Sequence, residues 1–193
     1  MSSNRARGVR PDPEEYAEYY HTYVSKVPDG DIVETLAAQG AEFVERIESI
    51  PEDRGDHRYA AGKWSVKEVI GHLVDTERVM GYRALAFARG DTTPLPGIDQ
   101  DVYVGGGNFT DRTLADLAAE FEALRVSHLN LFASFDDGIW VRRGTASDCG
   151  FTVRAVAWIM AGHVTQHAAV LEERYLWSRP LTIDPLPSPF ARE

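Results

Sequence analysis

The hydrophobic positions of this chain recur at the spacing of amphipathic helices in four separate stretches. The first stretch repeats apolar residues every three or four positions over 31–50, begins at Asp31 with Glu34 three residues later, and stops at Pro51. An aspartate cap followed at this spacing by a glutamate is typical of a helix start, and a proline ends a helix. The pattern therefore predicts a first long helix over 31–50.

Three further stretches show the same periodicity. The second begins with a capping box at Ser65 and closes at Gly90. The third covers about 113–135, where apolar residues alternate in steps of three and four, and the fourth runs from about 152 to the Arg179-Pro180 pair. These patterns predict four helices, and we expect an all-α four-helix bundle.

The remaining segments connect or flank these helices. The connection 91–110 is rich in proline and glycine, so we expect a long crossover loop between the second and third helices. We divide the chain into an N-terminal extension over 1–30, the bundle over 31–177 and an extended tail over 178–193. The extension carries four tyrosines at helical spacing, which we expect to pack against the bundle: Tyr16, Tyr19, Tyr20 and Tyr23.

Composition narrows the class of protein. A chain of 193 residues with 44% hydrophobic content can bury a core as one domain without a structural metal. A net charge of −10 repels phosphate backbones, so nucleic acid is not an expected partner. Cys149 is the only cysteine, which excludes an intrachain disulfide, and no signal peptide or membrane span is visible. We therefore expect a cytoplasmic protein with no membrane partner.

Three histidines are the candidates for chemistry. His163 and His167 are four residues apart, so both imidazoles leave one face of the fourth helix and can bind one cation. Buried imidazoles need a partner, which a metal would supply, although such spacing also arises by chance. His72 is the candidate third ligand, because a bundle brings facing helices together. Val164 follows His163 in place of the glutamate of zinc peptidases, which disfavours proteolysis.

Four other residues are candidates to support the site or contact a substrate. Gln166 and Thr76 are polar neighbours of the histidines and are candidates to orient the imidazoles. His128 points inward on the third helix, where we expect a hydrogen-bonded core histidine. Arg83 lies on the same helix face as His72 and is a candidate to bind an anionic group of a substrate. We favour instead an ion pair for Arg83 at the edge of the bundle. No residue is assigned a catalytic role.

Three groups of residues together resemble a known family. They are the run Trp64–Leu73, the turn segments 88–91 and 95–101, and Gly162-His163-x-x-x-His167 followed by 171–176. In this order they resemble the DinB superfamily, also called the DNA-damage-inducible or YfiT-like group. The resemblance implies an up-up-down-down-like four-helix bundle, frequently a homodimer. It also implies a divalent metal bound by one histidine of the second helix and two of the fourth, which match His72, His163 and His167.

The resemblance also suggests a reaction. The family includes metal-dependent transferases and isomerases that use a low-molecular-weight thiol such as mycothiol or bacillithiol. Three imidazoles leave a zinc or nickel ion an open position, as in catalytic sites, and iron or manganese would also fit. We expect a thiol-dependent S-transferase, or a related transferase or isomerase, acting on a small-molecule substrate. A metal-dependent hydrolase and a non-catalytic metal- or ligand-binding dimeric bundle are the alternatives.

Overall fold

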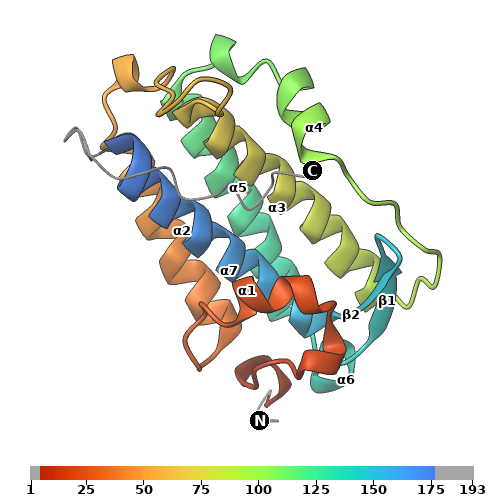
Figure 1. The fold of residues 1–193 in the computed structure, drawn as a ribbon. Helices are drawn as coiled ribbons and strands as arrows, with labels where there is room; N and C mark the ends of the chain where they lie inside the picture. Colours follow the sequence, from red (N-terminus) through yellow and green to blue (C-terminus); the bar gives the residue numbers. More distant parts are fainter. Residues whose placement is uncertain (1–4, 177–193) are drawn as a thin grey trace.

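Four long helices pack side by side in the computed structural model, which describes residues 5–176. They are α2 (Ile32–Glu48), α3 (Val66–Ala88), α5 (Leu114–Ala133) and α7 (Val153–Val170) (Figure 1). Helices α2 and α3 each contact both α5 and α7, so the four enclose one core. The expected four-helix bundle is confirmed.

Each long helix begins at a residue whose side-chain oxygen accepts a hydrogen bond from the backbone of the first turn. These caps are Asp31, Ser65, Thr113 and Thr152. At Ser65 the exchange is reciprocal, because Glu68 accepts a hydrogen bond from the backbone N–H of Ser65. Gly90, with a φ of 77°, follows the end of α3. The start signals in the sequence therefore located the starts of the four long helices to within a residue or two.

Helix α7 ends earlier than the sequence predicts. A π-helical turn, Leu171–Leu176, follows Val170, and its Tyr175 hydroxyl donates to the carbonyl of Trp64 at 2.8 Å. This bond ties the end of α7 to the start of α3. The expected continuation to Pro180 and the tail over 178–193 lie outside the described residues.

The connection between α3 and α5 is not the plain loop that the sequence predicts. It contains α4 (Gln100–Gly106), capped by the Asp99 side chain, and the 3₁₀ turn η5 (Phe109–Asp111). Phe109 lies on α3, and a Cβ atom at Gly71 would come within 2.3 Å of its ring. Proline and glycine on either side of α4 disfavour a helix, so the sequence predicts a loop. In the structure, the Asp99 side chain accepts hydrogen bonds from the first N–H groups of this helix.

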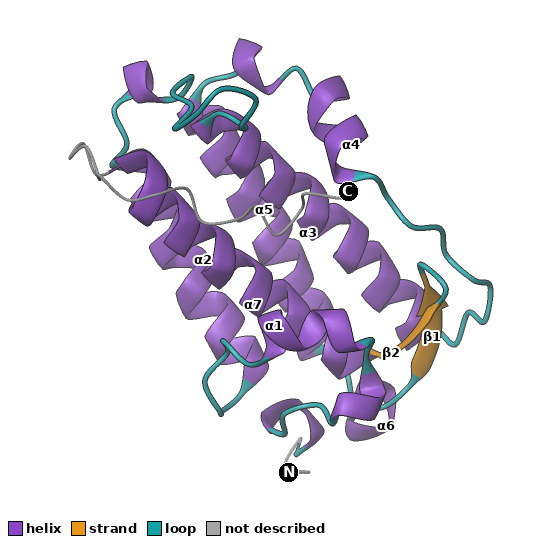
Figure 2. Cartoon of the chain, in the orientation of Figure 1, coloured by secondary structure: helices purple, strands orange, loops and turns teal. Residues whose placement is uncertain are grey.

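Two small elements between α5 and α7 are also absent from the sequence prediction. They are α6 (Asp137–Trp140) and an antiparallel hairpin of β1 (Arg143–Ala146) and β2 (Cys149–Thr152) (Figure 2). The turn residues Ser147 and Asp148 have φ of 51° and 60°, which suits a two-residue hairpin turn. Cys149 therefore begins a strand and is not part of a loop. Strands of four residues are too short to show an alternating pattern.

The N-terminal segment, which here means residues 5–30, packs against the bundle. It forms the 3₁₀ turns η1 (Ala6–Gly8), η2 (Pro13–Glu15) and η3 (Glu18–Tyr20), then α1 (His21–Val24), which packs on α7 (Figure 1). The Arg10 guanidinium stacks over Trp158 at 4.7 Å, and the Nε of Arg154 donates to the carboxylate of Glu15 at 2.7 Å. The segment is thus held by both charge and aromatic contact.

A polar layer divides the apolar core into two clusters. The cluster near the hairpin includes Trp140 and Trp158, and the other includes Phe43 and Phe121. Between them lie buried polar side chains from α3, α5 and α7: Glu77, Arg125, His128 and His163. Among the described residues, no helix is long and apolar enough to cross a membrane.

Candidate metal centre

The structure brings three histidines together in this polar layer. His72 comes from α3, and His163 and His167 come from successive turns of α7. The Nε2 atoms of His72 and His163 are 3.1 Å apart, and one ring nitrogen from each of the three lies within 4.8 Å of the other two. Residues separated by more than ninety positions thus point their donor atoms at one small volume.

Burial keeps these imidazoles neutral. His72 is 5% exposed and His163 is 8% exposed. Removal from water lowers the pKa of His72 to about 3 and the pKa of His167 to about 4, and lowers the pKa of His163 well below its ordinary value. A neutral imidazole keeps a nitrogen lone pair available for a metal ion at neutral pH.

The donor set fits a divalent first-row metal. Nitrogen ligands about 2.0–2.1 Å from a tetrahedral zinc lie about 3.3–3.4 Å from one another, close to the distance between His72 and His163. Among the described residues, the group contains no carboxylate or thiol. Three neutral nitrogen ligands would leave the full charge of the ion and at least one coordination position free.

Two aromatic rings flank the histidines, and the sequence alone did not assign either to the site. The Trp64 ring lies 5.0 Å from the ring of His72, and the Tyr23 ring lies 5.3 Å from that of His163. Tyr23 can approach because Gly162 has no side chain: a Cβ there would lie 2.1 Å from the Tyr23 carbonyl oxygen. A glycine directly before a candidate ligand is the signal that could have indicated this close approach.

Comparisons with known proteins agree with this architecture. The family model described as DinB superfamily matches residues 35–171, about two thirds of the chain. The chain belongs to the DinB superfamily. No curated protein matches it.

A solved structure shows the same fold as this DinB-superfamily chain. YfiT from Bacillus subtilis superposes with a TM-score of 0.65 at 18% identity, over 88% of this chain and 95% of its own. YfiT is described as a probable metal-dependent hydrolase with an unusual four-helix bundle topology.

The other candidate residues of this DinB-superfamily chain lie at varying distances from the histidines. Thr76 is buried one turn after His72, and Gln166 is half-buried on α7. Within the described part of the chain, neither makes a hydrogen bond to the three imidazoles. Their expected orienting role therefore has no contact to support it.

His128 belongs to a separate network. Its Nδ1 lies 3.1 Å from the Glu77 carboxylate, which also accepts two hydrogen bonds from Arg125, at 2.6 and 3.2 Å. Arg125 further donates to the Leu36 carbonyl and to Gln39, whose amide reaches α7 at the Ala161 carbonyl. His128 is thus the hydrogen-bonded core histidine that we expected.

Arg83 does not form the ion pair that we favoured. It is 3% exposed, and its guanidinium donates to the Pro96 carbonyl at 3.1 Å and to the Ser147 hydroxyl at 3.0 Å. No salt bridge joins it to a carboxylate within residues 5–176. The connection to α4 and the hairpin turn cover this part of α3, so the bundle edge expected from periodicity is an interior position.

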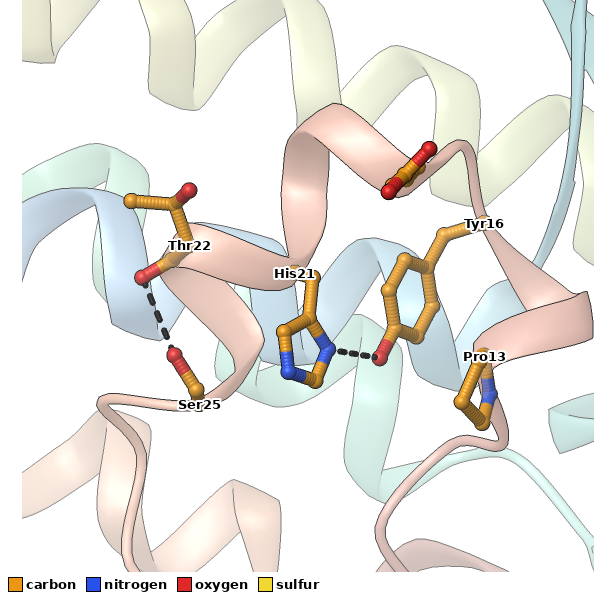
Figure 3. A pocket seen from close by; sticks show the side chains of 6 residues that line it. Pro13, Tyr16, His21, Thr22 and Ser25 are labelled. Atoms are coloured by element: carbon orange, nitrogen blue, oxygen red, sulfur yellow. Dashed lines mark hydrogen bonds between the residues drawn. The ribbon is translucent and has the colours of Figure 1, made fainter.

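A surface cavity of about 630 Å³ is lined by residues of the N-terminal segment (Figure 3). It is lined by Pro13, Tyr16, Glu18, His21, Thr22 and Ser25. The Tyr16 hydroxyl and the Nδ1 of His21 are 3.1 Å apart, so these two polar groups bond to each other. None of the three clustered histidines lines this cavity.

Proposed function

We propose that this chain is a mononuclear metal-dependent enzyme that activates a small nucleophile at His72, His163 and His167. The observation that carries the proposal is the convergence of three imidazoles from two helices, two of them buried and the third, His167, half-buried. A divalent cation held by them would lower the pKa of a coordinated water or thiol and supply a nucleophile at neutral pH. Zinc and nickel suit this donor set best, and iron or manganese would also be accepted.

The protein's own residues hold the donor atoms in place. The capping box at Ser65 fixes the start of α3, and the Tyr175 hydroxyl ties the last turn after α7 to Trp64. Trp64 and Tyr23 pack against two of the imidazoles and restrict their rotation. Packed aromatic rings also keep water away, which strengthens electrostatic interactions at the centre.

Thiol transfer is the first candidate reaction. A thiol bound to the cation would have a lowered pKa and would release its proton to solvent, so no protein base is required, and no described carboxylate hydrogen-bonds to the clustered imidazoles. In the transfer, the sulfur forms a bond to an electrophilic carbon while the leaving group departs with the bonding electron pair. The nucleophile would be a low-molecular-weight thiol, and the acceptor would be a small molecule.

Hydrolysis is the second candidate, favoured by the similarity to YfiT and its description. A water nucleophile requires a proton acceptor, and Asp75 is the nearest carboxyl group along α3, three residues after His72. It is half-buried, and desolvation raises its pKa above the ordinary value. A non-catalytic metal-binding bundle is the third alternative.

Metal content and thiol binding test the proposal together. Protein purified without an affinity tag is loaded with cobalt(II), and small thiols are titrated while the sulfur-to-cobalt absorption band is recorded. We expect one metal per chain, a thiol-dependent band, and loss of both in His163→Ala but not in the control His128→Ala. Metal that accepts neither thiol nor water would support the non-catalytic bundle instead. Water exchange without a thiol band, joined to ester or amide cleavage, would support the hydrolase.

Assembly into a homodimer is a separate proposal that rests on family membership. A dimer would have twice the 21.5 kDa mass of one chain. Light scattering of the purified protein measures that mass directly, and a monomer across the working concentration range would contradict the proposal.

A further inference from the structure

Arg83 is a buried cation without a protein counter-charge. Arg125 is similarly buried and Arg154 is half-buried, and each pairs with a carboxylate, Glu77 and Glu15 respectively. Within the described residues, no carboxylate forms such a pair with Arg83, although it is 3% exposed. Buried charges are normally paired, so the exception needs a reason.

The hydrogen-bond partners of Arg83 are neutral. Its guanidinium donates to the carbonyl of Pro96 and the hydroxyl of Ser147, and lies 3.9 Å from the sulfur of Met80. The phenol of Tyr20 lies near enough for the Arg83 charge to act on its pKa. These contacts occupy N–H groups and fix the direction of the guanidinium, but they leave its positive charge uncompensated.

A continuous aromatic wall connects Arg83 with the histidine centre. Tyr20, which lies near Arg83, has its ring 6.3 Å from the ring of Tyr23. The Tyr23 ring in turn lies 5.3 Å from the ring of His163. The N-terminal segment thus borders both positions, and a ligand extended along it would meet both.

The same two positions lie on one stripe of α3. His72, Thr76, Val79 and Arg83 follow one another at intervals of four, three and four residues, which places them on one helix face. The Cα atoms of His72 and Arg83 are about 16 Å apart at 1.5 Å per residue. The contact with Met80 shows that the Arg83 side chain turns back toward His72, which shortens this span. Val79 between them is half-buried, so this part of the helix face reaches solvent.

We propose that Arg83 binds the carboxylate of a small substrate whose reacting group lies at the three-histidine centre. This inference rests on the proposed function and names its substrate class: a short molecule with a carboxylate at one end and the thiol, or the acceptor carbon, at the other. A single guanidinium matches the single charge and planar shape of a carboxylate. The two fixed points select substrates by length as well as by charge.

Paired thiols test this inference on the cobalt-loaded protein. A homologous series of ω-mercaptoalkanoic acids is compared with the ω-mercaptoalkanols of equal chain length, and the Kd of each is read from the sulfur-to-cobalt band. At the matching length we expect the acid to bind about ten- to hundredfold more tightly than the alcohol, as for a hydrogen bond to a charged group. Arg83→Met should bring this ratio to about one. Arg89→Met, at an exposed arginine just after α3, should leave it unchanged.

The outcomes separate this inference from the proposed function. Equal affinities for acids and alcohols, with a normal band, would overturn the role of Arg83 and leave metal-bound thiol chemistry intact. If no thiol gives a band, thiol chemistry fails, and the carboxylate site is tested by the rise in melting temperature with glutarate. A rise in the wild type that Arg83→Met lacks would support the site, and equal rises would overturn it.

A second variant covers the case in which Arg83→Met does not fold. Arg83→Lys keeps the positive charge but loses the planar pair of donors, so the acid should retain only part of its advantage over the alcohol. An unchanged ratio of the acid and alcohol Kd values in a folded Arg83→Lys would show that the planar pair of N–H donors does not contribute to binding.

Discussion

Two groups of polar side chains lie in the same layer of this bundle, one between α3 and α5 and the other between α3 and α7. In one, Glu77 is paired with Arg125 and hydrogen-bonded to His128, and Arg125 continues to the backbone of α2. In the other, His72, His163 and His167 face one another with no described carboxylate among them. The first group satisfies its charges internally, whereas the second brings two imidazole nitrogens within 3.1 Å of each other without a counter-charge and suits an external cation.

The difference shows how to separate structural polar groups from functional ones. A complete network stabilises the position of its helices and has no remaining capacity to bind a ligand. An incomplete group costs free energy until a partner arrives, so its retention in a folded chain indicates a binding role. Arg83 resembles the histidines in this respect and differs from Arg125.

Breaking the complete network should have the largest effect on stability. Glu77→Ala leaves the Arg125 charge buried and unpaired, and should lower the free energy of unfolding by about 3–5 kcal/mol. Chemical denaturation measures this loss. The double variant Glu77→Leu with Arg125→Leu removes both charges and should be more stable than Glu77→Ala alone; equal losses would show that the pair is not the cause.

Binding of a metal ion by the three histidines should raise the free energy of unfolding by about as much as Glu77→Ala lowers it. Zinc at a thousandfold excess over its Kd should raise the free energy of unfolding by about 4 kcal/mol, because only the folded chain presents the three donors together. Thermal or chemical denaturation with and without zinc gives the difference. His128→Ala should keep this gain and His163→Ala should lose it; a gain in both would place the metal elsewhere.

A matched pair of glycine substitutions should disturb one group at a time. A Cβ at Gly81 would lie 2.0 Å from Nε2 of His128, and one at Gly162 would lie 2.1 Å from the Tyr23 carbonyl oxygen beside His163. Each alanine should cost about 1–3 kcal/mol through overpacking. Metal titration should show weaker binding only in Gly162→Ala, and the same loss in Gly81→Ala would show that the two groups are coupled.

The two groups should also respond to pH in different windows. In the metal-free chain, the folded-state pKa values of the three histidines lie below the ordinary 6.5, so the unfolded state takes up protons first as pH falls. Stability should therefore fall below about pH 6.5, by up to about 1.4 kcal/mol per pH unit for each histidine. The pKa of Glu77 is lowered from 4.5 by Arg125 and His128 despite the opposing effect of burial, so its contribution is lost only below about pH 4.5.

Denaturation across this range distinguishes the two contributions. Replacing the three histidines with glutamine should flatten the decline above about pH 4.5, and Glu77→Gln should flatten only the part below it. A decline above pH 4.5 that survives without the histidines would contradict their buried, neutral state.

Local signals made the scaffold predictable. The caps at Asp31, Ser65, Thr113 and Thr152 are read from neighbouring residues, and helical periodicity places His163 beside His167. The pairing of His72 with them depends on how two helices face each other, so it required the bundle architecture and the family resemblance as well.

The parts that were missed depend on contacts between distant segments. Tyr23 meets His163 only because α1 crosses α7, and Arg83 becomes interior only because Pro96 and Ser147 cover it. The spacing of apolar residues indicates which face of a helix is buried, but not which segment packs against that face. Helix α4 and the hairpin are too short to produce a periodic pattern at all.

The aromatic wall and the histidines come from different parts of the chain. His72, His163 and His167 lie within the stretch 35–171 that matches the family, whereas Tyr20 and Tyr23 precede it. The ring that flanks His163 therefore lies outside the stretch that matches the family. Replacing the side chain at Tyr23 should therefore change the surroundings of His163 while leaving the three donor atoms on α3 and α7 in place.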